Sequence, residues 1–262
     1  MAPKRGNTGQ ATTAGGGAVY IKSFTPTLSK GEGVKTLINY QSNQIMATIE
    51  SIQNAYIDYV LTEGIQPKSV YIFAKQNDMT EAEFYQFFGS FEAVEQNIWA
   101  DFATKTLTEI RTQEVWLQYA AREKALSFFY GFFELLKGSR SFAVYTINKQ
   151  PKGFSTPRVF EKLKDIYENF ADEILKEGIE SAELSDRKFF SKRYKDALWI
   201  QFVFVLNFWI NDNSTGFEKT DEAIEKGVNV TFDLFQRSPI DNLFEYGKFL
   251  VKNGGMKDRM GF

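Results

Sequence analysis

The sequence predicts an all-α protein, and three observations lead to that prediction. Apolar residues recur at steps of three and four along most of the chain, a spacing that places them on one face of a helix. Ser and Thr stand at the starts of several of these runs and Gly follows some of them, as is typical of helix caps. No convincing alternation of polar and apolar residues indicates a β strand. With 262 residues, 43% of them hydrophobic, the chain can bury a sizeable core.

The first predicted helix covers residues 49–62. It ends at Gly64, a residue type favoured just after helices because it adopts positive φ without strain. Residues 65–67 form the connecting turn, and a second helix begins after Ser69. The apolar face of this second helix consists of Val70, Phe73 and Ala74.

A helix-turn-helix is predicted over residues 69–94. The polar stretch 76–78 separates the second helix from a third, whose N-cap is Thr80. Glu83 lies three residues after Thr80, the spacing of a capping box. Ser90 repeats the capping pattern and opens a fourth helix that is predicted to run to about residue 109. The apolar faces of these two helices are Phe84, Tyr85 and Phe88, and then Val94, Ile98 and Phe102.

Helical spacing continues through the rest of the chain. The segment 113–136 carries aromatic residues on more than one face, which predicts a helix that is buried on nearly all sides or lines a cavity. Residues 141–147 form either a short helix or an extended connector. Pro157 fits the first turn of a helix, since that position needs no backbone N–H. The later predicted helices cover 157–174, 185–211, 217–236 and 240–251.

A family pattern can be followed through the head of the chain without a gap. Its positions read Ala55, Tyr59, Gly64, Ser69, Val70, Phe73, Ala74, Asp78, Met79, Thr80, Phe84, Tyr85, Phe88 and Ser90. This pattern resembles the N-terminal head of the TetR family of bacterial regulators. Two positions differ, because Asp78 stands where the family has a turn Gly and Phe91 stands where a basic residue is usual.

The resemblance covers roughly residues 46–252 and implies the domain organisation. A TetR-like all-α fold would have a three-helix, helix-turn-helix head at 46–95. A helical ligand-binding and dimerisation body would follow at 96–252. Composition predicts that residues 1–45 are a disordered or poorly ordered extension and that 253–262 are a tail. Since the extension holds five bases and one acid, two interpretations stay open: a basic arm that reaches a DNA groove, and an inert tail.

The resemblance further implies that a homodimer binds operator DNA. The DNA-contacting residues would be Lys68, Ser69, Thr80, Tyr85 and Gln86. Charge argues in the other direction, because eight acids and two bases between residues 50 and 95 give a net charge of 2 − 8 = −6. Most affinity for DNA comes from Lys and Arg. The alternative is therefore a TetR-fold protein that has lost DNA binding and carries a lipid or quinone.

In TetR-like proteins the middle helices enclose a ligand and the last long helices pair across a two-fold axis. The effector here would be a hydrophobic small molecule or lipid, although for any one Phe ordinary core packing is the competing interpretation. The predicted ligand-pocket residues are Trp116, Phe128, Phe129, Phe132, Phe133, Phe142, Tyr145, Phe160, Tyr167, Trp199 and Phe202. The predicted dimer-interface residues are Phe204, Phe208, Trp209, Ile224, Val228, Phe232 and Phe235.

Composition argues against common catalytic sites. The chain has no Cys and no His, which excludes Ser-His-Asp and thiol catalysis and most zinc sites. We expect no enzymatic activity, no cofactor and no metal. The longest apolar run, 197–210, is too short to span a bilayer, and the absence of Cys fits a reducing cytoplasm. The sequence therefore predicts a cytoplasmic, ligand-responsive transcriptional regulator.

Overall fold

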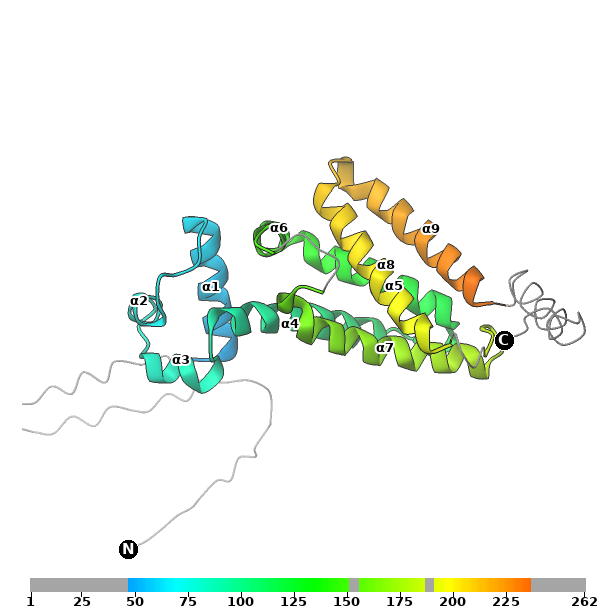
Figure 1. Ribbon diagram of the computed structural model, residues 1–262, viewed down its shortest axis with the longest axis horizontal. Coiled ribbons are helices and arrows are strands. Elements are labelled where there is room, and N and C mark those ends of the chain that lie inside the picture. The colour runs from blue at the N-terminus through cyan, green and yellow to red at the C-terminus, as the bar shows by residue number, and fades with distance from the viewer. Residues whose placement is uncertain (1–46, 151–155, 187–190, 237–262) are drawn as a thin grey trace, which may run out of the picture. The chain divides into compact units, whose positions relative to one another are not determined.

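A computed structural model describes residues 47–150, 156–186 and 191–236, and all structural statements below refer to these ranges. Their regular structure is helical throughout, as the sequence predicts (Figure 1). The α-helices are α1 (Ile49–Glu63), α2 (Val70–Gln76), α3 (Glu81–Phe87), α4 (Phe91–Arg111), α5 (Ala121–Lys137), α6 (Arg140–Asn148), α7 (Glu161–Glu180), α8 (Ser191–Asn211) and α9 (Glu218–Phe235). Three short 3-10 helices are η1 (Trp116–Gln118), η2 (Arg158–Phe160) and η3 (Thr215–Phe217).

The first three helices and the start of α4 pack around an aromatic core. Tyr56 stacks on Phe91 with ring centroids 5.4 Å apart. Phe73 and Phe84 meet the same Phe91 ring edge-on, at 5.4 and 5.5 Å. Phe91 is buried, so a basic side chain at this position would lie inside the head core. Phe91 therefore replaces the basic residue of the TetR pattern because its side chain fills the core of the head.

The body is built on α4, which continues from the head and packs against α5 and α7 (Figure 1). Helix α9 packs against both α5 and α8, and α7 also packs against α8. Helix α6 packs against α1 of the head as well as against α5 and α8. The head and the body are therefore joined twice, by the continuous helix α4 and by the contact of α1 with α6.

The predicted helix over 113–136 is wrong at its N-terminal side. The chain leaves α4 at Arg111, forms η1, and begins α5 only at Ala121. The carboxylate of Glu183 accepts hydrogen bonds from the backbone N–H groups of Ala121 and Arg122, at 2.8 and 3.2 Å. A side chain distant in the sequence thus satisfies the free amides at the start of α5, so the chain can turn there.

Other predictions differ from the structure in smaller ways or lie outside it. Pro157 precedes η2, and α7 begins three residues later than η2 does, so Pro157 is not the first residue of an α-helix. Residues 141–147 lie within helix α6. The predictions for residues 1–45, for a helix at 240–251 and for the tail at 253–262 lie outside the described residues. In the described ranges, no helix has the length and the apolar character required to cross a membrane.

Candidate functional site

The helix-turn-helix of the head is fixed by its capping residues. The Ser69 hydroxyl accepts a hydrogen bond from the Ile72 N–H at 3.2 Å and caps α2. Thr80 and Glu83 form the predicted capping box of α3, with the Thr80 N–H donating to the Glu83 carboxylate at 2.7 Å. Asp78 occupies the turn with φ of +52°, a conformation that Gly adopts more easily but that Asp tolerates. These local bonds fix the starts of α2 and α3 at the positions predicted from the sequence.

All five predicted DNA-contacting residues are exposed on the head. Lys68 and Ser69 lie at the start of α2, and Thr80, Tyr85 and Gln86 lie at or on α3. The Tyr85 side chain is 53% exposed, while its neighbour Phe84 is fully buried and packs edge-on against it. Tyr85 is therefore presented to the surface by a ring that anchors α3 in the head core.

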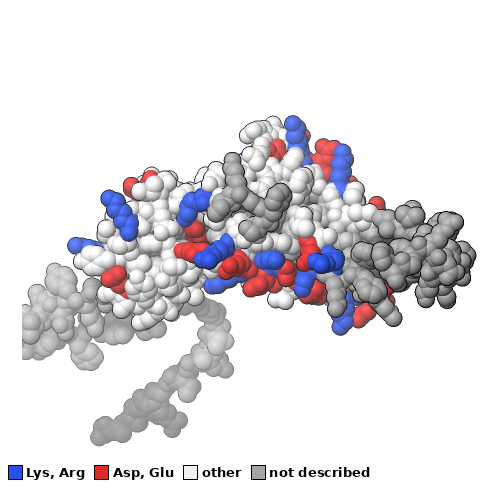
Figure 2. All heavy atoms as spheres, viewed as in Figure 1, with Lys and Arg blue, Asp and Glu red and all other residues white. Residues whose placement is uncertain are grey.

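The acidic character of the head is partly offset within the structure. Glu83 lies in the first turn of α3, where the free N–H groups of the helix N-terminus compensate a negative charge. Glu95 is 2% exposed and forms an ion pair with Lys149. On the face shown in Figure 2, positive and negative side chains alternate over the described residues, and no broad basic area is visible there. The head therefore lacks, on this face, the surplus of Lys and Arg that commonly drives DNA affinity.

Lys149, Glu95 and Tyr56 form a polar cluster that joins the head to the body, with Glu95 and Tyr56 buried and Lys149 partly exposed. The Lys149 ammonium donates to Glu95 Oε1 at 2.7 Å, and the Tyr56 hydroxyl donates to the same oxygen at 2.6 Å. Burial, and then the bond to Glu95, raises the pKa of Tyr56, so this hydroxyl stays protonated. Lys149 also donates to the Gln66 side chain at 3.3 Å, in the loop between α1 and α2. These contacts connect the end of α6 to α1, to α4 and to the loop that precedes α2.

The predicted pocket residues fall into one packed aromatic cluster and four outlying positions. In the cluster, Phe128 and Tyr167 have ring centroids 5.2 Å apart, and Phe202 lies 5.0 Å from Tyr167. These are direct ring contacts, so the rings pack against one another. Phe129, Phe132, Phe133 and Trp199 belong to the same cluster. The outlying residues are Trp116, which packs on Phe170; Phe160, which packs on Trp99; and Phe142 and Tyr145 on α6.

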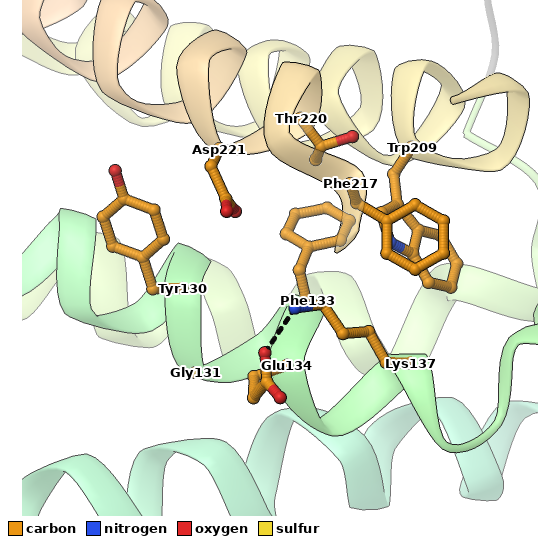
Figure 3. Close-up of a pocket in the computed structure, with 9 residues that line it drawn as sticks. All are labelled: Tyr130, Gly131, Phe133, Glu134, Lys137, Trp209, Phe217, Thr220 and Asp221. Carbon is orange, nitrogen blue, oxygen red and sulfur yellow. Dashed lines mark hydrogen bonds and ion pairs between the residues drawn. The ribbon is translucent and has the colours of Figure 1, made fainter. Parts of the chain in front are cut away.

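A pocket of about 320 Å³ lies beside this cluster, between α5 and the start of α9 (Figure 3). Phe133 is the residue that it shares with the predicted pocket set. Its walls combine aromatic rings with polar groups at the mouth. The lining residues are Tyr130, Gly131, Phe133, Glu134, Lys137, Trp209, Phe217, Thr220 and Asp221.

One arginine fixes the aromatic end of this pocket. The Arg140 guanidinium carbon lies 4.6 Å from the ring centroids of both Trp209 and Phe217. Its N–H groups donate to the backbone carbonyls of Trp209 and Ile210, at 2.7 and 2.8 Å, and so cap the C-terminus of α8. Arg140 therefore combines cation–π contacts with helix capping and holds both rings in place.

The turn between α8 and α9 is fixed by Asp212. Its carboxylate accepts hydrogen bonds from the backbone and the hydroxyl of both Ser214 and Thr220, at 2.7 to 2.9 Å. Burial by itself would raise the Asp212 pKa, but these four bonds outweigh burial and hold the pKa well below its ordinary value. Phe217 follows in the left-handed region, with φ of +66°, which is strained for a bulky residue. The position of this ring is thus imposed by the surrounding contacts.

A family model described as "Tetracyclin repressor-like, C-terminal domain" matches residues 124–250. In this chain, residues 124–250 therefore form a TetR-like C-terminal domain. The fold of the chain is also that of solved TetR structures. The TetR transcriptional regulator from Nitrosomonas europaea ATCC 19718 is 12% identical, with a TM-score of 0.51 over 70% of this chain and 96% of that chain. FadR from Bacillus subtilis, solved with stearoyl-CoA, is 19% identical, with a TM-score of 0.51 over 69% of this chain and 98% of that one. No curated protein sequence matches the chain.

Within this TetR fold, the predicted dimer-interface residues divide into two groups. Phe204 is 63% exposed and Phe208 is partly exposed, on the outer side of α8. The other five are buried inside the single chain, because the faces of α8 and α9 that carry them pack against each other and against α5. These five residues are Trp209, Ile224, Val228, Phe232 and Phe235. The outer apolar face is instead formed by Phe204 with Ile200 and Val230, which are 68% and 59% exposed.

Several residues of the TetR body site escape sequence reasoning. Lys137 and Asp221 carry no signal in the sequence, Tyr130 is one of many aromatic residues in the segment 113–136, and Trp209 is predicted as an interface residue. They meet only because α9 folds back across α5, a contact between distant segments. Lys149 also has no local signal, since its partner Glu95 is 54 residues away. The polar turn at 212–216, which precedes Phe217, is the one local hint that the chain reverses near a wall of the pocket.

Proposed function

We propose that this TetR-like protein is a ligand-responsive transcriptional regulator that binds operator DNA as a homodimer. The observation that carries the proposal is the capped helix-turn-helix, which presents Lys68, Tyr85 and Gln86 at the surface. In such a head, the second helix enters the major groove and its exposed side chains meet base edges. Ser69 and Thr80 would meet phosphates, and such contacts position the head without selecting a sequence.

A hydrophobic ligand in the body would control the spacing of the two heads. Binding selects the body conformation that accommodates the ligand, and a changed distance between heads no longer fits two half-sites. The Lys149–Glu95 ion pair supports this mechanism, because it connects the end of α6 to the buried Glu95 carboxylate at the start of α4. FadR from Bacillus subtilis was solved with stearoyl-CoA, which supports an apolar effector for the present chain.

Truncation of Tyr85 tests the DNA-binding step. We expect Tyr85→Ala to weaken specific binding to the protein's own promoter fragment by about tenfold or more, since the ring is exposed on the recognition helix. Leu117→Ala is the matched control, because Leu117 is 88% exposed but lies on the body. Fluorescence anisotropy of labelled promoter DNA provides the measurement. An unchanged affinity and footprint for Tyr85→Ala would remove Tyr85 from the DNA interface.

The homodimer is proposed from the apolar outer face of α8 and α9. Ile200 and Phe204 are one turn apart on α8, and Val230 lies on α9; all three are more than half exposed. A large exposed apolar face is an aggregation hazard in a monomer, whereas a two-fold contact of the face with its own copy removes the face from water.

We expect Phe204→Glu to convert the dimer into monomers. A carboxylate placed in an apolar two-fold interface meets its own copy and loses water, which should weaken the dimer by roughly a hundredfold or more. Sedimentation velocity at micromolar concentration measures the change, with Leu117→Glu as the control for an added exposed charge. A wild-type chain that sediments as a monomer would contradict the proposed dimer.

The second candidate function is a TetR-fold carrier of a lipid or quinone that does not bind DNA. The acidic head favours it, because the net charge of −6 between residues 50 and 95 repels a duplex. Under this function, a hydrophobic molecule would co-purify with the protein and the promoter fragment would remain unbound at low salt. Mass spectrometry of an organic extract of the purified protein separates the two functions.

A further inference from the structure

The helix α3 presents three uncharged side chains together at the surface of the head. Phe84, in the middle of the helix, is fully buried in the head core. Ala82, Tyr85 and Gln86 are exposed, and Ala82 lies three residues before Tyr85 and four before Gln86, so the three are neighbours on the other side of the helix. In a helix-turn-helix the second helix enters the major groove, and these are the side chains that would meet base edges there.

This surface of α3 cannot make the commonest specific contact with DNA. That contact pairs Arg or Lys with O6 and N7 of guanine. The helix α3 holds neither residue type, and the sequence has no Arg or Lys from residue 76 to residue 104. The two bases of the head are Lys68, just before α2, and Lys75, in the last turn of α2. Because the first helix of the motif crosses the DNA backbone, these lysines would meet phosphates, and guanine would have no partner.

The side chains that remain suit A·T pairs. The Gln86 amide has an acceptor and a donor, which match the N6 amino group and N7 of adenine. Guanine offers two acceptors at the same places, so the amide oxygen would be left facing another acceptor. The Ala82 methyl group and the Tyr85 ring can make apolar contacts with the C5 methyl group of thymine, which a G·C pair lacks.

Glu81 is the one exposed side chain at the start of α3 that would favour a G·C pair. A carboxylate accepts a hydrogen bond from the N4 amino group of cytosine. Glu81 lies in the first turn of the helix, five residues before Gln86, which corresponds to about 7.5 Å along the helix axis. A cytosine contact of Glu81 would therefore lie at one end of the site and would not replace the adenine contact of Gln86.

The acidic charge of the head increases the weight of these base contacts. Lys and Arg at phosphates supply essentially all non-specific affinity for DNA. Between residues 50 and 95 the chain has two bases against eight acids. A duplex of the wrong sequence should therefore bind very weakly, and recognition depends on what α3 meets in the groove.

We propose that α3 selects A·T pairs in the major groove, with Gln86 bonded to an adenine and with Ala82 and Tyr85 packed on thymine methyl groups. This inference rests on the proposed function, because it names the bases that a DNA-binding head of this composition selects. The preference belongs to the major-groove edges of the bases and not to the narrow minor groove of A-tracts. Changes confined to the major groove should therefore remove it.

Base analogues test the proposal on the wild-type protein. The half-sites that the protein protects in its own promoter fragment are synthesised with 7-deazaadenine, which lacks the N7 acceptor, or with uracil in place of thymine, which lacks the methyl group. Both analogues keep base pairing and the minor-groove edge. We expect each to weaken binding about fivefold or more at one or more positions of a half-site, whereas 7-deazaguanine should change the affinity by less than about twofold. The same analogues outside the protected half-sites are the control.

Two variants of Gln86 identify the side chain that reads the adenine. Gln86→Ala should bind the normal and the 7-deazaadenine half-sites with equal affinity, because it has no amide to lose. Gln86→Arg should change the preferred pair at that position from A·T to G·C in a selection from random duplexes, since Arg pairs with guanine. This gained preference decides the matter if Gln86→Ala binds too weakly to compare. Gln118→Ala is the matched control, because Gln118 is exposed but lies in η1 of the body.

The outcomes separate this proposal from the proposed function. A promoter complex that 7-deazaadenine and uracil leave unchanged, or that 7-deazaguanine weakens most, would overturn the base preference and leave DNA binding in place. A Gln86→Arg protein that still selects the wild-type site would overturn the role of Gln86. If no complex forms with the promoter fragment even at low salt, the base preference and the regulator fall together.

Discussion

Replacing Phe202 by Ala is expected to lower the free energy of unfolding by about 3–5 kcal/mol, because the change leaves a cavity in a close-packed core. Phe202 is fully buried, and its ring centroid lies 5.0 Å from that of Tyr167 and 5.1 Å from that of Phe132. It also stacks on Trp199 at 5.4 Å. The ring contacts residues of α5, α7 and α8, so its removal breaks contacts with all three helices. The neighbouring rings cannot move into the cavity without losing their own packing contacts.

Chemical denaturation followed by circular dichroism measures this loss. Tyr85→Ala is the control, since it removes an aromatic ring that is 53% exposed and should lower stability by less than about 1 kcal/mol. If Phe202→Ala is as stable as that control, the aromatic cluster is not the packed core of the body. Its rings would then be free to form the ligand pocket that the sequence predicts.

The second large effect is expected at the cluster that joins head and body. Lys149→Met leaves the Glu95 carboxylate buried with Tyr56 as its remaining partner, and the side chain of Glu95 is only 3% exposed. Breaking a fully buried pair costs about 3–5 kcal/mol, and because Lys149 is 35% exposed we expect the lower value of about 2–3 kcal/mol. The head should also lose protection from hydrogen exchange in the α1–α2 loop, since Lys149 donates to Gln66 there.

Two further variants show whether the Lys149 effect belongs to the ion pair. Glu95→Gln combined with Lys149→Met removes both charges, and most of the lost stability should return because no buried charge remains unpaired. Lys226→Met removes a lysine from an exposed pair with Glu222 and should change stability little. A loss in the double variant equal to that of Lys149→Met would show that packing, and not charge, holds α6 to the head.

The head could be predicted from the sequence because its structure is set by neighbours in the chain. The hydroxyls of Ser69, Thr80 and Ser90 each accept a backbone N–H three residues later. These bonds locate the starts of α2, α3 and α4 within a residue. The start of α5 depends instead on Glu183, which lies 62 residues beyond Ala121. The spacing of apolar residues along a helix does not reveal a contact between residues so far apart in the sequence.

The sequence does not reveal which face of α8 is buried and which is exposed. Phe202 and Phe204 stand two residues apart in a run that is apolar all round, yet Phe202 is fully buried and Phe204 is 63% exposed. Periodicity cannot choose between them, because either face would satisfy it. The pocket is hidden for a related reason. Whether aromatic rings enclose a cavity or fill it depends on how the helices pack against one another. Trp209 lines the pocket because α9 packs against α5.

Whether this chain binds DNA is measured by titrating its own promoter fragment with purified wild-type protein over a series of salt concentrations. For a DNA-binding regulator we expect a complex at low salt that protects two half-sites related by two-fold symmetry, with an affinity that falls as salt rises. No complex even at the lowest salt, together with a hydrophobic molecule in the purified protein, would contradict the regulator and identify a carrier.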